Sequence, residues 1–160
     1  MLKLLRCDDR LIHGQCVTKL ISHYSVKDII VIDNFTASNA MLCKIFASAV
    51  PKGIHCEVVT VENAKALLPE AMENDKNTIV LMKTPDIMYE LYQSVEGLPK
   101  DYNIASVPSA AGRKAITNFT YLDEKQAAAV KGMVDMGVHV WFQLIPDSQL
   151  YEWDDVKDKF

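Results

Sequence analysis

Apolar runs of strand length alternate with helix-length stretches along almost the whole of this 160-residue chain. The strand-length runs cover residues 1–5, 28–33, 54–61, 77–83, 102–107, 115–121 and 138–145. Strands that are apolar throughout and alternate with helices are typical of a parallel sheet covered on both faces. The sequence therefore predicts an α/β fold of three layers, α/β/α, around a mostly parallel central sheet of about six to seven strands.

Proline, glycine and capping residues mark the expected helices, which cover residues 16–24, 38–50, 62–74, 85–97 and 124–136, with a short further helix from residue 148. Thr84 offers an N-cap with Pro85 at the first helical position. Asp123 caps the next helix, which Gly137 ends. Pro69 lies inside the third expected helix and predicts a kink there.

Length and composition indicate one domain, residues 1–160, of an ordinary soluble protein. A formal net charge of −4 argues against nucleic-acid binding, which normally needs a basic face. No apolar run approaches the roughly 20 residues of a membrane span, and the first residues lack the features of a signal peptide. The four cysteines form no C-x-x-C pair, so we expect reduced thiols and a cytoplasmic location.

A turn rich in charged residues, RCDDRLIHGQ at positions 6–15, joins the first expected strand to the first expected helix. Open α/β sheets place their ligands at such turns. Right-handed crossovers put this turn on one sheet edge together with the loop after Asp33, the Thr84 turn and the loop 108–113. We therefore expect this edge to be the functional face.

The residues of this turn favour chemistry on a phosphoryl group. His13 is a candidate nucleophile, because an imidazole of ordinary pKa, about 6.5, is mostly neutral at pH 7. Arg6 and Arg10 can bind phosphoryl oxygens bidentately. Gly14 lets a phosphate approach the backbone at a helix start, where N–H groups are free. The nucleotide-binding glycine motifs and the G-x-S-x-G elbow are both missing from the sequence.

Other interpretations of the same turn remain open. Asp8 or Asp9 can fix the imidazole tautomer by accepting a ring N–H. Both aspartates and His13 can also be read as metal ligands, but no further ligand cluster accompanies them, so no metal site is predicted. The other three histidines are expected to be structural, and Trp141 and Phe142 to lie in the core.

The string DDRLIHGQ at residues 8–15 resembles the IIB subunit of the mannose/fructose/sorbose group of sugar phosphotransferase systems. The segments DIIVIDN at 28–34, KTPD at 83–86 and GVHVWFQLIP at 137–146 fall where that family has comparable segments. The resemblance covers the whole chain and implies a parallel sheet with helices on both sides.

The resemblance implies that His13 takes a phosphoryl group from the phosphohistidine of a IIA domain. The group then passes to a sugar that enters through IIC and IID membrane subunits. Arg10, with Asp9, would complete the catalytic group, and Arg6, Gly14 and Gln15 would bind the phosphate. No cofactor is implied beyond the covalent phosphohistidine.

The expected protein is thus a cytoplasmic phosphotransferase subunit, peripherally associated with its membrane partners and compatible with a homodimer. A second interpretation is a non-catalytic α/β module that binds a phosphorylated ligand or partner at the same face. Phosphate carried on the chain after incubation with a donor would distinguish the two.

Overall fold

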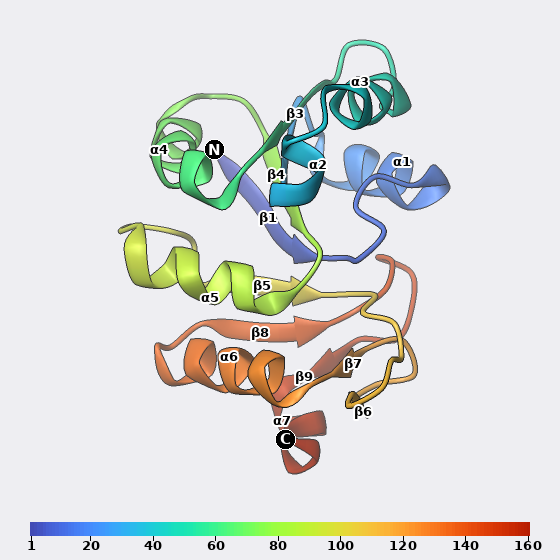
Figure 1. Ribbon diagram of the computed structural model, residues 1–160, viewed down its shortest axis with the longest axis vertical. Coiled ribbons are helices and arrows are strands. Elements are labelled where there is room, and N and C mark those ends of the chain that lie inside the picture. The colour runs from blue at the N-terminus through green and yellow to red at the C-terminus, as the bar shows by residue number, and fades with distance from the viewer.

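The computed structural model places a mixed, mostly parallel sheet between two layers of helices (Figure 1). It describes residues 1–14 and 17–160, so Gln15 and Cys16 lie outside the described residues. Within that description the sheet has seven strands in the order β3-β2-β4-β1-β5-β8-β9. They are β1 (Leu2–Cys7), β2 (Asp28–Ile32), β3 (His55–Val59), β4 (Thr78–Met82), β5 (Asp101–Ile104), β8 (His139–Phe142) and β9 (Tyr151–Glu152). All neighbouring pairs are parallel except β8–β9, which confirms the predicted fold class.

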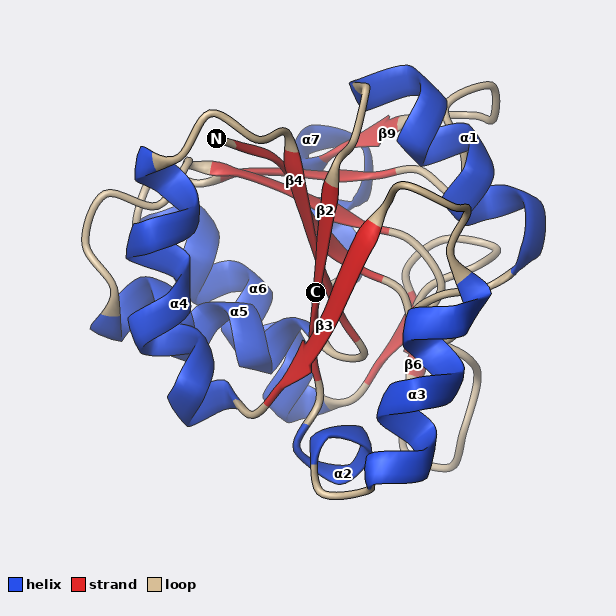
Figure 2. Ribbon diagram, turned by 90° about the horizontal axis from the view of Figure 1, so that it is seen from above, coloured by secondary structure: helices blue, strands red, loops and turns tan.

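The longer helices divide between the two faces of the sheet. One face carries α4 (Val61–Glu73), α5 (Pro85–Ser94) and α6 (Glu124–Asp135), and the other carries α1 (Gly14–Tyr24) and α3 (Ala40–Ala49) (Figure 2). The short elements are α2 (Asn34–Ala37), α7 (Trp153–Val156) and the 3₁₀ turn η1 (Lys157–Lys159). The second face therefore has fewer long helices than the first to cover the same sheet.

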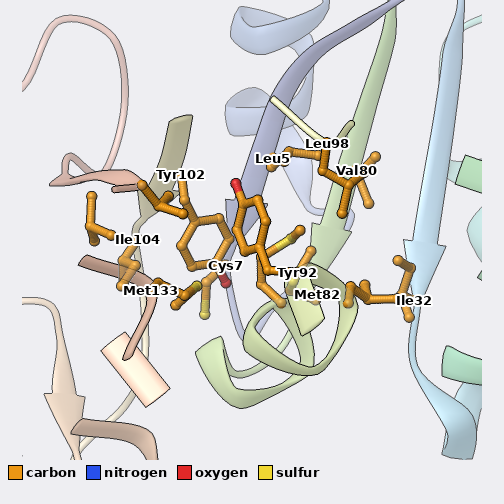
Figure 3. Packing of buried hydrophobic residues seen from close by; sticks show 14 of the residues in the cluster. Leu5, Cys7, Ile32, Val80, Met82, Tyr92, Leu98, Tyr102, Ile104 and Met133 are labelled. Atoms are coloured by element: carbon orange, nitrogen blue, oxygen red, sulfur yellow. The ribbon is translucent and has the colours of Figure 1, made fainter. Parts of the chain in front are cut away.

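Buried residues on alternate strand positions supply two cores, one on each side of the sheet. In β1, Leu5 and Cys7 belong to the core under α4–α6, whereas Leu4 belongs to the core under α1 and α3. Figure 3 shows part of the first core, in which Cys7 and Tyr102 from the strands pack with Met133 from α6. This period of two is the geometry that a strand imposes on its side chains.

Two expected elements differ in the structure. The strand expected at 115–121 is instead a separate hairpin of β6 (Lys114–Ala115) and β7 (Tyr121–Leu122). Its chain reverses because the N–H groups of Ile116 and Thr117 both donate to the carbonyl of Thr120, at 2.9 and 3.2 Å. The helix expected from Ser148 begins only at Trp153, because the residues before it pair with β8 as the edge strand β9.

Two further expectations concern helices. The helix expected at 38–50 is α3, which begins two residues later because Asn39 caps it by accepting from the N–H groups of Met41 and Leu42. The short helix α2, just before it, was not expected. Helix α4 continues across Pro69 to Glu73.

Asp123 begins α6 with a complete capping box. Its carboxylate accepts the N–H of Gln126 at 2.8 Å, and the Gln126 side chain accepts the N–H of Asp123 at 3.2 Å. We expect Asp123→Ala to lower the free energy of unfolding by about 1 kcal/mol, because the N–H of Gln126 loses its acceptor. Urea denaturation measures the change. Asp135→Ala, at the other end of α6, is the matched control, and a cost equal to that of Asp123→Ala would contradict the prediction.

Candidate functional site

The turn after β1 lies at the carboxyl ends of the parallel strands, where the polar residues singled out in the sequence were expected. The N–H of Asp8 donates to the carbonyl of Met82 at the end of β4, at 2.8 Å. The N–H of Asp9 donates to the carbonyl of Ser106, just after β5, also at 2.8 Å. His13 is the N-cap of α1 and is half-buried. The two neighbouring strands therefore fix the turn from both sides.

Asp8 is a buried carboxylate between two arginines. Its Oδ2 accepts from Nη2 of Arg6 at 2.9 Å, and its Oδ1 accepts from Nε of Arg10 at 3.1 Å. The side chains of Asp8 and Arg6 are only 1% and 3% exposed, whereas that of Arg10 is 42% exposed. Because both carboxylate oxygens are occupied by guanidinium groups, Asp8 serves to orient Arg10 and is not available as a metal ligand.

Arg6 differs from the sequence expectation of a phosphate contact. Besides Asp8, its guanidinium donates to the Asn103 side chain and to the carbonyls of Gln143 at 3.2 Å and Leu144 at 2.7 Å. The side chain is thus committed to the protein interior, where it ties the turn to β5 and to the loop after β8. A buried arginine with this many acceptors is a structural anchor.

Arg10 has the free donor that a phosphate needs. Nε and Nη2 face Asp8, at 3.1 and 3.3 Å, and Nη1 makes no hydrogen bond to any residue that the structure describes. Two donors held by a carboxylate restrict the side chain, and the remaining edge of the guanidinium is open to a ligand.

The imidazole of His13 is oriented by the backbone. Nδ1 lies 3.3 Å from the carbonyl oxygen of Leu11, a contact that favours the proton on Nδ1. Leu11 itself has a left-handed φ of 54°, which turns this carbonyl toward the ring side of the loop. Among the described residues no hydrogen bond joins either aspartate to the ring, so the Leu11 carbonyl takes the orienting role that the sequence suggested for Asp8 or Asp9. A main-chain carbonyl leaves no signal in the sequence.

Two polar atoms of the turn are left without partners. His13 Nε2 and Asp9 Oδ1 are both buried and make no hydrogen bond to the residues described. Gly14 follows with a φ of 34° and is the first residue of α1. Its role in phosphate binding stays a prediction. Gln15, the third expected phosphate-binding residue, lies outside the described residues.

A second charged pair lies on the same sheet edge. Asp33, directly after β2, accepts from the Lys83 ammonium at 3.0 Å and caps α2 through the N–H of Thr36 at 2.9 Å. Burial raises the pKa of Asp33, but the hydrogen bonds from Thr36 and Lys83 outweigh burial and leave this pKa below its usual value. Lys83 also lies 5.9 Å from the ring centroid of the exposed Phe35. The edge thus brings together the loop after Asp33 and the turn at Thr84, as expected.

The loop 108–113 makes no hydrogen bond to the described residues of the turn. Its Arg113 folds back and donates to the carbonyl of Pro108 at 2.7 Å. Contact with the turn comes from Ala105 and Ser106, just before the loop.

Among residues 1–14 and 17–160 we find no helix with the length and hydropathy of a membrane span.

Comparisons with known proteins agree with this geometry. Residues 2–159 match the family model for the PTS system sorbose subfamily IIB component. An N-acetylgalactosamine-specific phosphotransferase enzyme IIB component 1 of Escherichia coli is 25% identical over 91% of this chain and 92% of its own length. A fructose-specific EIIB component of Bacillus subtilis is 25% identical over 89% of this chain and 87% of its own. A mannose-specific EIIAB component of Escherichia coli is 27% identical, over 86% of this chain but 42% of its own length.

Solved structures share the fold over nearly the full chain. The IIB domain of the sorbose permease from Klebsiella pneumoniae superimposes with a TM-score of 0.90 at 22% identity and covers 99% of this chain and 98% of its own. A second structure, from Thermoanaerobacter tengcongensis, gives a TM-score of 0.87 at 27% identity, over 100% of this chain and 96% of its own. This chain therefore belongs to the sorbose subfamily of IIB components of the sugar phosphotransferase system, the mannose/fructose/sorbose group that its sequence resembles.

Proposed function

We propose that this IIB component accepts a phosphoryl group on His13 from the phosphohistidine of a IIA domain and passes it to a sugar. The observation that carries the proposal is the placement of His13 at the start of α1, in the same turn as the half-exposed Arg10, whose Nη1 is free among the described residues. IIB components are phosphotransferases in general, and the relatives named above are specific for sugars.

The transfer has two balanced steps. In the first, the unprotonated ring nitrogen of His13 attacks the donor phosphorus, a new N–P bond forms, and the donor imidazole leaves with its electron pair. The proton that the His13 ring then loses from its other nitrogen balances the proton that the donor imidazole takes up. In the second, a sugar hydroxyl attacks, an O–P bond forms, and the N–P bond on His13 breaks. The proton lost by the hydroxyl balances the proton gained by the leaving imidazole. Neither step needs a metal or cofactor.

The ring must move before the first step. Nδ1 contacts the Leu11 carbonyl and Nε2 is buried, so neither nitrogen is presented to an incoming phosphorus. Rotation of the side chain about its bond to Cα frees a nitrogen, and Asp9 Oδ1 can then accept the opposite N–H of the ring. In this proposal Asp9 keeps the catalytic role expected from the sequence.

The remaining residues of the turn divide between contact and support. Arg10 binds the phosphoryl oxygens through its open edge, together with Gln15 and the backbone around Gly14. Arg6 is a positioning residue, because it acts through Asp8 on Arg10. In this proposal Arg6 positions Arg10 and does not bind the phosphate itself, which differs from the role that the sequence suggested.

The partners of this proposal are a IIA donor, IIC and IID membrane subunits and the sugar. The EIIAB name of the mannose-specific relative supports a IIA partner. The protein would work in the cytoplasm, peripherally associated with the membrane subunits.

Incubation with a phosphorylated IIA domain tests the proposal. The expected result is an acid-labile, hydroxylamine-sensitive phosphoryl group on the peptide that contains His13, found by mass spectrometry of the intact chain and of its fragments. Tight binding of the donor without label on this chain would contradict it and favour the non-catalytic module.

Arg10→Lys should slow the transfer to His13 by roughly 10- to 100-fold, because one charge-assisted hydrogen bond and the bidentate fork are lost. Rapid-quench measurement of label on this chain gives the rate, and a titration gives the affinity for the donor, which should change less. Arg113→Lys, in the exposed loop 108–113, is the matched control. Equal rates for the two variants would remove Arg10 from the phosphate site.

A further inference from the structure

A cavity of about 380 Å³ lies on the side of the sheet that carries α1 and α3. Its wall is made by residues of α1 and of the neighbouring strands β5 and β8. The strand residues that face it alternate with core residues: Asp101 and Asn103 in β5, and His139 and Trp141 in β8. The volume falls in the usual range for small-molecule sites, roughly 300–1,000 Å³.

The wall combines flat aromatic surface with open polar groups. The remaining apolar lining comes from Leu4, Leu20, Ile145, Pro146 and Leu150. Nε1 of Trp141 donates to Asp101 Oδ2 at 3.2 Å, which fixes the indole. The Tyr24 hydroxyl makes no hydrogen bond to any residue of the described chain, and the Tyr24 ring lies edge to face with His23, with centroids 4.7 Å apart.

The charged groups of the wall are already paired with one another. Arg6 is paired with Asp8. His139 is held between Asp101 at 2.6 Å and Glu152 at 2.7 Å. The hydrogen bond with Glu152 raises the pKa of His139, burial lowers it, and Asp101 adds to the rise, so that the net pKa lies above the usual value. A charged ligand would therefore meet no charge in the wall that lacks a partner.

We propose that this cavity binds a neutral, hydroxylated small molecule of the monosaccharide class. The C–H face of a sugar ring would pack on Trp141 and Tyr24, which present apolar surface with polar edges. Its hydroxyls would meet the Tyr24 hydroxyl, the His23 ring and the unused lone pairs of Asp101. This site is separate from the phosphate site at His13, and its binding can be measured without phosphoryl transfer.

The two tryptophans of the chain make a direct test. The side-chain N–H resonances of Trp141 and Trp153 are followed by NMR while the full chain is titrated with D-glucose, D-mannose, D-fructose, L-sorbose or N-acetyl-D-galactosamine. Trp153 packs on Phe160 in the C-terminal region, with ring centroids 4.7 Å apart, and serves as the internal reference. At least one sugar should shift the Trp141 resonance in a saturable way and leave that of Trp153 in place. Failure of all five sugars to do so overturns the proposal.

A variant and two comparison ligands sharpen the test. Tyr24→Phe keeps the aromatic wall and removes the hydroxyl, so the Kd of the bound sugar should rise roughly three- to tenfold. Tyr121→Phe, in β7 outside the cavity lining, should leave the Kd unchanged. A hexose phosphate and choline should bind the cavity more weakly than the neutral sugar. Tighter binding of either charged ligand, or an unchanged Kd for Tyr24→Phe, contradicts the assignment.

Discussion

His13→Ala will abolish the transfer of a phosphoryl group to this chain and leave its folded state nearly intact. The substitution removes the nucleophile, and no other group in the proposed mechanism replaces it. The His13 side chain makes no capping hydrogen bond to α1 and is only half-buried, so the free energy of unfolding should change by less than about 1 kcal/mol. Label from a phosphorylated IIA donor and urea denaturation measure the two quantities.

His55→Ala is the matched control for this experiment. His55 lies in β3 at the far edge of the sheet, is exposed, and pairs with Asp28 at 3.3 Å. It should take label at the wild-type rate. If the His13→Ala protein also takes label at that rate, another residue is the nucleophile and the proposed roles in the turn are wrong.

Asp8→Ala should destabilise the protein by about 3–5 kcal/mol, the largest loss that we expect from a single substitution in the turn. The substitution leaves the Arg6 guanidinium buried beside a lost carboxylate, and removal of one partner of a buried pair costs more than the pair contributes. The transfer rate should fall as well, because Arg10 loses the group that holds its Nε and Nη2. The midpoint of urea denaturation measures the first effect.

Asp147→Ala is the control for the energetic argument, since it also breaks one ion pair. Asp147 pairs with Lys19 at 3.1 Å, but its side chain is 77% exposed, so the expected cost is at most about 1 kcal/mol. Asp8→Asn, which keeps a hydrogen-bond acceptor beside Arg6, should fall between the two. A cost for Asp8→Ala no larger than that for Asp147→Ala would show that burial of the pair has little energetic weight.

Much of the fold follows from the sequence because its strands and helices obey local rules. The strand β4 is buried at every position and apolar from Ile79 to Met82, and α6 and α5 begin where the cap Asp123 and the N1 proline Pro85 predict. The sequence predicts β8 as a strand apolar throughout, yet His139 and Trp141 alternate with buried Val140 and Phe142. That period of two indicates a strand with one face less covered, which is where the cavity lies.

The site was predictable in its location and less so in its details. A sequence places Arg6 and Arg10 in one turn, but burial separates them, because Arg6 points from β1 into the protein and Arg10 projects from the turn itself. The acceptors that hold Arg6 include the main-chain carbonyls of Gln143 and Leu144, more than 130 positions away along the chain. Such contacts depend on the register of β1, β5 and β8, which no local pattern reveals.

Arg6 borders both the turn at residues 6–15 and the cavity, and α1 starts at the turn and ends at Tyr24 on the cavity wall. Two sites that share a buried side chain and a rigid helix can exchange free energy, and thermodynamic linkage makes that exchange reciprocal. A molecule that binds the cavity more tightly after His13 is phosphorylated must stabilise the phosphorylated form by the same factor. In the proposed mechanism, the affinity of the cavity for its ligand would then depend on whether His13 carries a phosphoryl group.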